Sequence, residues 1–511
     1  MALACPLRHW CRISIAAFLL AAASARISQA VSPAAPATTS KDLGSRIRSV
    51  LASGCLEPSK TGIEVISLKD GGEIFSKNPD SPLKPASNQK LFTSAAALAL
   101  LKPDFVFPTI FYSTQQPRQG VLDADLYIKG FGAPDLVGEF WWLMVQELYR
   151  QGLREIRGDI VADDTYFDSE ERPRVWPETV PEDSWVSAPV GALSFNYDVV
   201  TVRVRPGPSV GSSPRIELIP LGGYFKVINR ATTSARGSRL IVGRGLQQGA
   251  NTIQVSGSIR LGSSPIEVVK GVEEPSFYAL AAFQELAARQ GIVIRGRHRR
   301  APIPPGALEL FRFESKPLAA IVRDMNKHSN NFIAETLLKT LGAELVGTPG
   351  TTAKGLQALR EYLSRIGVTS DGIALADGSG LSHENRVTAR ALVQTLRAMN
   401  EDFELWPEFL SSLPIAGVDG TLQRRFRKED LLRKVRAKTG KIAGVTALSG
   451  YAVNAEEETF AFAILMNDYR CGTETIKRLT DQVCSALVES RFRLAPASPA
   501  GAPAQGGQPT R

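Results

Sequence analysis

The spacing of apolar residues changes along the chain and divides it into three stretches. In the first, residues 41–52 carry apolar side chains at helical spacing, and residues 62–72 predict a strand that enters a glycine turn. Residues 91–101 form an Ala- and Leu-rich run that Pro103 ends, which predicts a helix. From about 105 to 310, by contrast, short strand-like runs are broken by Gly, Pro and Ser.

The middle stretch contains one predicted amphipathic helix, at residues 139–151, with Trp141 and Trp142 expected in the core. The last stretch is helical again and then gives two strands, joined by an acidic turn, and a final helix. Its predicted helices cover residues 318–341, 352–366, 388–399 and 473–491, and its strands cover 446–453 and 459–466. Helices around antiparallel strands predict one α+β domain whose two halves are separated by a mostly β insertion.

Both chain ends differ in composition from the rest. Basic residues precede an apolar run at residues 13–23 that is too short to span a bilayer. This predicts a signal peptide over residues 1–30 and an exported, periplasmic or extracytoplasmic protein, with an uncleaved anchor as the alternative and the cleavage site left open. Residues 31–40 and 495–511 are rich in Ala and Pro, so we expect a loose leader and a disordered tail.

Composition narrows the class of protein further. The 511 residues are 43% apolar and 22% charged, which excludes a disordered, collagen-like or polytopic membrane chain. The net charge of +9 comes partly from two basic runs, residues 295–300 and 424–428, which we expect to be a solvated loop and a solvated helix face. No nucleic-acid partner is expected of an exported protein, whereas peripheral association with an anionic wall or membrane surface stays open.

Cysteine and histidine are too scarce to suggest a metal centre. After the signal peptide only Cys55, Cys471 and Cys484 remain, so one disulfide is allowed in an oxidising compartment and its pairing is open. The chain has four histidines and no ligand motif such as H-E-x-x-H. We therefore predict no metal and no cofactor.

The strongest chemical signal is an S-x-x-K motif, Ser87 to Lys90, that opens the Ala- and Leu-rich helix. Side chains three apart on a helix lie on the same face. A lysine that loses its proton through desolvation could then accept the proton of the serine hydroxyl and activate it as a nucleophile. A second S-x-x-K, from Ser81 to Lys84, contains Pro82, which prevents a helix from aligning the pair.

Two further motifs follow in order along the chain. Ser329-Asn330-Asn331 begins a helix, and Lys438-Thr439-Gly440 stands just before a strong strand. Both templates also match elsewhere: S-x-N at Ser76 and Ser194, and K-T-G at Lys60. Only the set that starts at Ser87, Ser329 and Lys438 has both the order and the setting of the serine β-lactamase and penicillin-binding protein signature.

With this set the chain resembles the low-molecular-mass penicillin-binding proteins of the D-alanyl-D-alanine carboxypeptidase/endopeptidase type, the penicillin-binding protein 4 group. The resemblance runs from the strand at Gly62 to the final helix and includes residues 158–167, 188–196, 377–382 and 413–422. It implies a serine β-lactamase/transpeptidase-like domain in two parts, residues 31–104 and 311–494, split by accessory domains at 105–310.

The resemblance also implies the reaction and its residues. Ser87 would attack the carbonyl of the penultimate D-alanine, with Lys90 as base, while Ser329 and Lys438 would relay the proton to the leaving group. Asn331 would bind the substrate amide and help to fix Lys90.

The remaining implied residues bind the substrate. Thr439, with Gly440 and Lys441, would hold the terminal carboxylate together with the charge of Lys438. The oxyanion would be bound by the backbone N–H groups of Ser87 and Lys441, where the loss of one such donor typically costs about 10²–10³ in rate.

A pair of acidic residues gives a sharper expectation. In related enzymes an Asp of the segment that matches Asp163-Asp164 reaches the cationic end of the peptide side chain, and the alternative is a turn Asp that caps local backbone. The chain also departs from the family pattern, with Gly130-Phe131-Gly132-Ala133-Pro134-Asp135 where G-x-G-D-P is frequent and His383 where Arg is frequent. We expect His383 to be a surface or hydrogen-bonding residue rather than a catalyst.

The expected substrate is therefore a peptidoglycan stem peptide, and β-lactams are the expected inhibitors. Roughly 240 residues separate Ser87 from Ser329, too many for a compact class A β-lactamase, and no Glu between them is followed by Asn four residues later. A slowly deacylating enzyme is the prediction. The alternatives are a β-lactamase or esterase on the same fold and a non-catalytic wall-binding protein; the preference for trimming or for cutting cross-links, and the oligomeric state, stay open.

Overall fold

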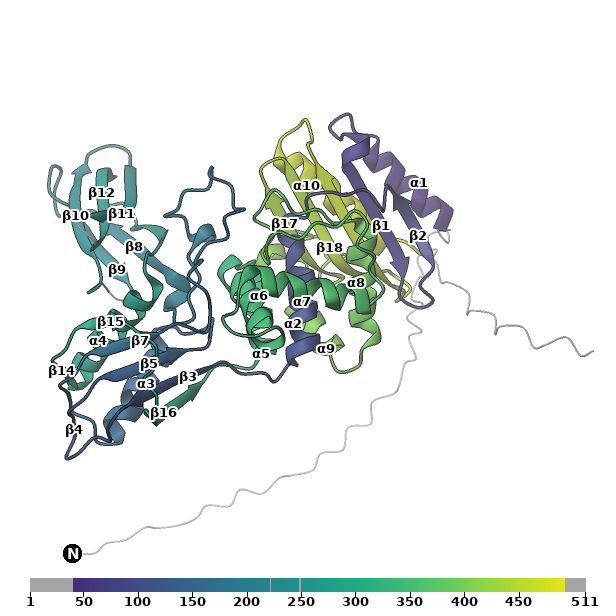
Figure 1. The fold of residues 1–511 in the computed structure, drawn as a ribbon. Coiled ribbons are helices and arrows are strands. Elements are labelled where there is room, and N and C mark those ends of the chain that lie inside the picture. The colour runs from purple at the N-terminus through teal and green to yellow at the C-terminus, as the bar shows by residue number, and fades with distance from the viewer. Residues whose placement is uncertain (1–39, 221, 248–249, 492–511) are drawn as a thin grey trace, which may run out of the picture. The chain divides into compact units, whose positions relative to one another are not determined.

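The computed structural model describes residues 40–220, 222–247 and 250–491 (Figure 1). The predicted signal peptide, residues 1–30, and the predicted tail, residues 495–511, lie outside this range. Among the residues described, no helix is both long enough and apolar enough to cross a membrane.

A five-stranded antiparallel sheet brings the two parts of the predicted α+β domain together (Figure 1). In order of pairing, its strands are β17 (Val435–Ile442), β18 (Val445–Val453), β19 (Thr459–Asn467), β1 (Thr61–Ser67) and β2 (Glu73–Lys77). Strands β1 and β19 pair from Thr61 with Met466 to Ser67 with Phe460. The predicted α+β fold class is thus confirmed, with sequence-distant strands at its centre.

The alternation of side chains along β19 explains why helices cover both faces of this sheet. Successive side chains of a strand point to opposite faces. One set packs in the same apolar cluster as α1 (Ser40–Leu51) and α10 (Thr473–Val488); it comprises Phe460, Phe462, Ile464 and Met466. The other set packs in the cluster that holds the remaining helices; it comprises Ala461, Ala463 and Leu465.

Helix α2 (Gln89–Leu101) is the central helix of the second cluster. Its residues from Gln89 to Leu98 are all buried, which accounts for the lack of a polar face in its Ala- and Leu-rich sequence. The helices around it are α5 (Leu318–His328), α6 (Asn331–Leu345), α7 (Thr352–Arg365), α8 (Ala389–Glu401) and α9 (Trp406–Ser412). Ser87, two positions before α2, therefore directly precedes a helix that is packed on all sides.

The described residues of the middle stretch form four further sheets. The largest has the order β15-β7-β5-β3-β16, and the others are β14-β6-β4, β13-β8-β9 and β10-β12-β11. The strands are β3 (Pro108–Ser113), β4 (Val121–Leu122), β5 (Leu126–Gly130), β6 (Glu155–Ile156), β7 (Ile160–Asp163), β8 (Val199–Arg205), β9 (Arg215–Ile219), β10 (Lys226–Ser234), β11 (Arg239–Gln247), β12 (Ala250–Arg260), β13 (Ile266–Gly271), β14 (Val293–Ile294), β15 (His298–Arg300) and β16 (Leu308–Glu314).

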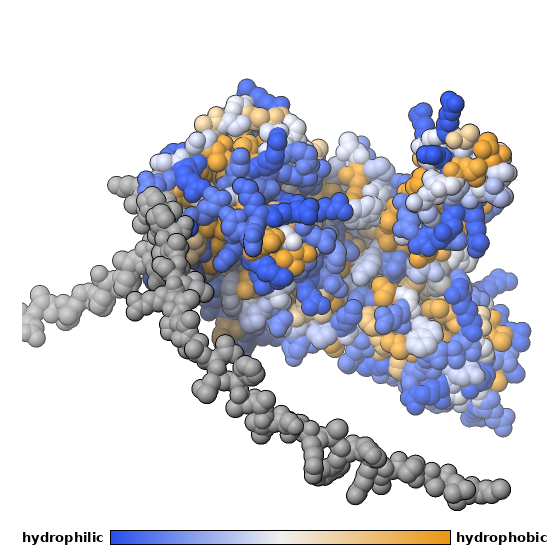
Figure 2. All heavy atoms as spheres, turned by 180° about the vertical axis from the view of Figure 1, so that it is seen from behind, coloured by the Kyte–Doolittle hydropathy of each residue, from blue (hydrophilic) through white to orange (hydrophobic). Residues whose placement is uncertain are grey.

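Two expectations for this stretch were wrong. It contains a second helix, α4 (Pro275–Gln290), besides the predicted α3 (Gly138–Arg150). The signals for α4 were a proline at its first position and Gly291 after its end, in the left-handed conformation. Trp141 is buried as expected, but Trp142 is 49% exposed. On the face seen in Figure 2, hydrophobic residues appear in separate patches between hydrophilic ones.

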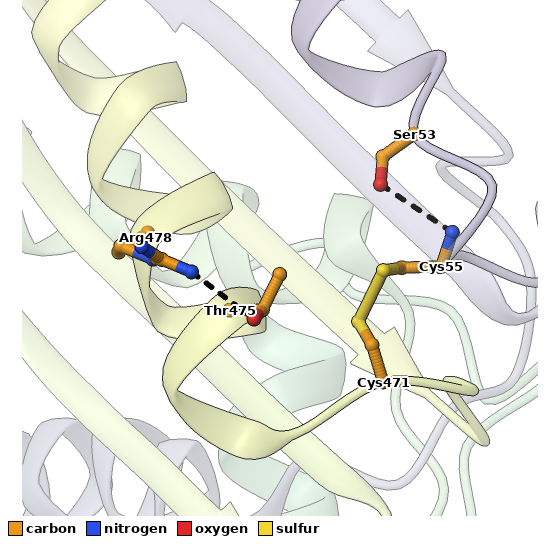
Figure 3. The surroundings of a disulfide bond; sticks show 5 residues. All are labelled: Ser53, Cys55, Cys471, Thr475 and Arg478. Atoms are coloured by element: carbon orange, nitrogen blue, oxygen red, sulfur yellow. Dashed lines mark hydrogen bonds between the residues drawn. A yellow bond between two sulfur atoms is a disulfide. The ribbon is translucent and has the colours of Figure 1, made fainter.

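A disulfide joins Cys55 to Cys471 (Figure 3), and Cys484 is a buried free thiol. The pairing that the sequence left open therefore connects the loop after α1 with the loop before α10. The two Cα atoms lie 5.3 Å apart, within the usual range for a disulfide.

Removal of this disulfide should destabilise the protein. We expect the double variant Cys55→Ser/Cys471→Ser to lower the free energy of unfolding by about 2–4 kcal/mol, because the bond closes a loop of more than 400 residues in the unfolded chain. Guanidinium denaturation of the oxidised protein measures this change. Cys484→Ala is the control for loss of a cysteine as such, and an equal effect in both variants would contradict the prediction.

Candidate active site

Ser87 lies in a short 3-10 turn, η2 (Ala86–Asn88), directly before α2. The Nζ of Lys90, in the first turn of α2, donates a hydrogen bond to the Oγ of Ser87 over 3.1 Å. The predicted S-x-x-K pair is therefore in contact, although the serine precedes the α-helix instead of lying inside it.

Lys90 is fully buried, and its ammonium donates to two further oxygens. Its Nζ lies 2.7 Å from Oδ1 of Asn331 and 2.7 Å from the carbonyl of Ser379. Burial lowers the pKa of Lys90 to about 7, and the charges of Asp377 and Glu335 oppose this shift. A lysine with this pKa is partly neutral near pH 7 and can accept a proton.

Ser329 and Asn331 lie where the predicted helix at 318–341 is in fact broken in two. Ser329 ends α5 in the left-handed conformation, with φ +58°, and Asn330 caps α6 by accepting a hydrogen bond from the N–H of Ile333. The break turns Ser329 Oγ toward Lys438, whose Nζ donates to it over 2.8 Å. One continuous helix could not place both side chains in this way.

Lys438 and Thr439 lie on a strand of their own, β17, which the sequence did not predict; the predicted strand, β18, follows it directly. Burial, and secondly the charge of Lys90, hold the pKa of Lys438 well below its usual range. The hydroxyl of Thr439 donates to Oγ1 of Thr421 over 2.8 Å. A Cβ at Gly440 would lie 2.7 Å from the carbonyl oxygen of Pro85, so glycine allows β17 to approach the Ser87 turn closely.

Two buried carboxylates shape the loop that faces Lys90. Glu335 accepts hydrogen bonds from the N–H groups of Gly378 and Ser379, at 3.0 and 2.8 Å. Asp377 accepts from the N–H groups of Gly380 and Ser382, both at 2.7 Å. Burial and the neighbouring charge of Asp377 raise the pKa of Glu335 to about 7.

A segment of the insertion, residues 164–189, which we call the strap, contacts the site directly. The carbonyl of Val186 accepts a hydrogen bond from Nδ2 of Asn331 over 2.8 Å. The indole N–H of Trp176 donates to Asp377 over 3.1 Å, and Lys339 of α6 donates to Asp168 over 2.7 Å. The strap thus orients the Asn331 amide, because its nitrogen is engaged by Val186 and its oxygen by Lys90.

Ser87 opens onto a cavity of about 460 Å³. Of the predicted residues, Ser329, Asn331, Thr439 and Lys441 line it as well, together with His328, His383 and Trp185. Burial, followed by the charges of Lys84 and Arg386, lowers the pKa of His383. Among the described residues no group of three or more His, Cys, Asp and Glu side chains could hold a metal ion.

The structure does not bring Asp163 and Asp164 to this cavity. Asp163 is buried, and its oxygens accept from the N–H and hydroxyl of Thr165 and from the N–H of Ile303. Asp164 pairs with Arg300 over 2.8 Å and accepts from Ser276. Neither lines the cavity, and the expectation that one of them reaches the substrate has no support in these contacts.

Several residues of the site escaped sequence reasoning. Glu335, Thr421, Trp176 and Val186 belong to none of the three motifs. A signal existed only for Glu335, which is a charged residue within the apolar run from Phe332 to Leu338. The contribution of Val186 is a backbone carbonyl, which no side-chain pattern can reveal.

Gly380 is a position where we predict a large cost for one methyl group. Its φ is +82°, and a Cβ would lie 1.8 Å from the carbonyl oxygen of Ala86, next to the nucleophile. Gly380→Ala should therefore lower the free energy of unfolding by about 2–4 kcal/mol and slow acylation by benzylpenicillin. Gly367→Ala is the matched control, since Gly367 has φ +78° with open space around it. Equal effects would show that backbone strain alone is responsible.

Known proteins match this chain in sequence over most of its length. A model of the D-Ala-D-Ala carboxypeptidase 3 (S13) family matches residues 43–489. A D-alanyl-D-alanine carboxypeptidase of an Actinomadura species is 37% identical over 447 residues, which cover 84% of this chain and 81% of that protein. The D-alanyl-D-alanine carboxypeptidase DacB of Haemophilus influenzae is 30% identical over 423 residues, covering 81% of this chain and 87% of the relative.

Solved structures extend the likeness to the fold. The crystal structure of penicillin binding protein 4 from Haemophilus influenzae superimposes with a TM-score of 0.74 at 27% identity, covering 87% of this chain and 97% of that one. The same protein complexed with a β-lactam gives a TM-score of 0.69 at 26% identity, with the same coverage.

Proposed function

Because the chain belongs to the D-Ala-D-Ala carboxypeptidase S13 family and is a hydrolase of that type, we propose that it acts on peptidoglycan stem peptides through an acyl-serine intermediate. Penicillin acylates the same serine. One observation carries the proposal: the buried Nζ of Lys90, with a pKa of about 7, lies 3.1 Å from the Oγ of Ser87 at the edge of the cavity. Export to the cell wall is part of the same proposal.

In the first half of the reaction, the Oγ of Ser87 forms a bond to the D-alanyl carbonyl carbon while neutral Lys90 takes the hydroxyl proton. The backbone N–H groups of Ser87 and Lys441 stabilise the oxyanion. The C–N bond then breaks, and the Ser329–Lys438 pair, joined by a 2.8 Å hydrogen bond, relays to the leaving amine the proton that Lys90 took from Ser87, so that Lys90 is neutral again. Water next attacks the ester carbonyl while Lys90 accepts a proton from it, and this proton passes to the Oγ of Ser87 as the ester C–O bond breaks, which releases the acid and restores the free serine.

The substrate is held on both sides of the broken bond. On the acyl side, the second N–H of the Asn331 amide is free to donate to a substrate carbonyl, since Val186 engages the nitrogen and Lys90 the oxygen. On the leaving-group side, Thr439 and Lys441 bind the carboxylate of the departing residue, and Gly440 keeps the strand close enough for this contact.

The test uses the purified mature protein. We expect release of D-alanine from diacetyl-L-lysyl-D-alanyl-D-alanine, and a stable covalent adduct by intact mass after exposure to benzylpenicillin. Rapid hydrolysis of the drug without an accumulated adduct would instead identify a β-lactamase. Absence of both reactions would contradict the proposal and favour a wall-binding protein.

A further inference from the structure

A second cavity, of about 430 Å³, adjoins the catalytic cavity at Thr439. It lies between β17, the turn after η5 (Gly420–Leu422) and the first turns of α10. We call it the cationic cleft, because five of its lining side chains are basic and two are acidic: Arg424, Arg425, Lys441, Lys477 and Arg478 against Glu474 and Asp481.

The acidic residues of the cationic cleft are already engaged. Asp481 pairs with Arg425 over 2.5 Å, and Glu474 pairs with Lys477 over 2.6 Å. The hydrogen bond from Lys477 is the largest cause of a lowered pKa at Glu474. In the described part of the chain Arg424, Lys441 and Arg478 form no ion pair, so the cleft presents positive charge that the protein itself does not neutralise.

The arginines of the other basic run differ from Arg424 and Arg478, because three of them form ion pairs within the protein. In residues 295–300, Arg295 pairs with Glu155 over 3.2 Å, and Arg299 pairs with Asp125 over 2.5 Å. Arg300 pairs with Asp164 over 2.8 Å. These ion pairs lie within the insertion. Residues 424–428, by contrast, form a turn after η5 rather than the predicted helix face. Arg424 of this turn lines the cleft.

The cationic cleft is continuous with the catalytic cavity. Thr421, Thr439 and Lys441 line both, and the hydrogen bond between the two threonine hydroxyls lies on this shared wall. Under the proposed function the carboxylate of the departing residue binds at Thr439. A side chain that extends from that residue would therefore pass the shared wall and enter the cationic cleft.

We propose that the cationic cleft binds a carboxylate carried by an extended leaving group, so that the enzyme prefers departing residues with an anionic side-chain extension over neutral ones. The inference rests on the proposed function, because the position of the leaving group depends on it. The chemical class is a peptide whose departing D-residue bears, beyond its own carboxylate, a second one. Arg424 and Arg478 supply the unpaired charges that would recognise it.

Two matched substrates test this inference. In both, diacetyl-L-lysyl-D-alanine is joined to the α-amine of a D-lysine, whose Nε carries either a succinyl or an acetyl group. The two differ by one carboxymethyl group and therefore by one negative charge. We expect kcat/KM to be at least about fivefold higher for the succinyl substrate, and this preference to shrink at high salt, because exposed charges are screened.

The variant Arg424→Gln/Arg478→Gln removes both unpaired guanidinium groups from exposed positions. It should reduce the preference to less than about twofold, while Arg427→Gln, from the same run but outside both cavities, keeps the wild-type preference. A wild-type ratio near one, a preference that survives in the double variant, or an equal loss for both substrates would each overturn the inference. Failure of the proposed function is distinguishable, because the wild type would then release neither leaving group and form no penicillin adduct.

Discussion

Ser87→Ala should abolish both the penicillin adduct and the release of D-alanine, with a loss in kcat on the order of 10⁶-fold. The expected loss is this large because, among the described residues, Ser87 has the one hydroxyl that is hydrogen-bonded to the Nζ of Lys90, and removal of the nucleophile from a serine hydrolase costs about this much. Intact mass after benzylpenicillin and a D-alanine release assay measure the two effects.

The chain supplies its own control for this change. Ser81 begins the second S-x-x-K segment, lines neither cavity and lies before the turn that holds Ser87. Ser81→Ala should leave adduct formation and D-alanine release unaffected. An active Ser87→Ala variant, or an inactive Ser81→Ala variant that is folded, would contradict the assignment of the nucleophile.

Lys90→Met should slow acylation by about 10²–10⁴-fold, the usual contribution of a positioned general base. The variant should also abolish the pH dependence that the wild-type acylation rate shows. Burial lowers the pKa of Lys90 to about 7, so the neutral form that accepts the proton increases as the pH rises through 7. Wild-type acylation by benzylpenicillin should therefore rise between about pH 5 and pH 8 and then level off, falling about tenfold per pH unit on the acidic side.

Two further variants distinguish the loss of the Lys90 base from other causes of slow acylation. Lys84→Met, the lysine of the second S-x-x-K segment, should retain the rate and its pH dependence. Asp377→Asn removes the larger of the two negative charges that oppose the pKa shift of Lys90, so it should move the rise to lower pH without removing it. If Lys90→Met kept the same pH profile at a reduced rate, another group would be the base.

Much of the fold could be predicted, because its strongest signals are periodic. The apolar run of β19 comes from its two buried faces, and the helical spacing in α1, α3 and α10 comes from one buried face on each helix. Helix α4 was missed because it interrupts a long stretch of strands. The apolar spacing predicted one helix over residues 318–341, whereas the motif predicted a helix that begins at Ser329-Asn330-Asn331; the left-handed backbone of Ser329 divides α5 from α6 there.

The candidate site was predictable where its chemistry resides in short motifs, and not where it depends on tertiary contacts. Ser87 and Lys90 are neighbours in sequence, so their contact follows from local structure. The loop around Glu335 and Asp377 requires two segments to fold against each other. For Asp163 the matching segment suggested a substrate contact, whereas its side chain bonds to the backbone of Thr165 and Ile303, which fits the alternative of an Asp that caps local backbone.

The pairing of β1 with β19 has a consequence for the synthesis of this chain. About 400 residues separate the paired positions, so at about 5–20 residues per second the ribosome needs roughly 20–80 s to produce the partner of β1. Ser87 and Lys90 are made early, but Lys438 and the strand that carries it come near the end. A nascent or truncated chain would hold the nucleophile without the groups that complete its site, and hydrolytic activity would arise only once translation is almost finished.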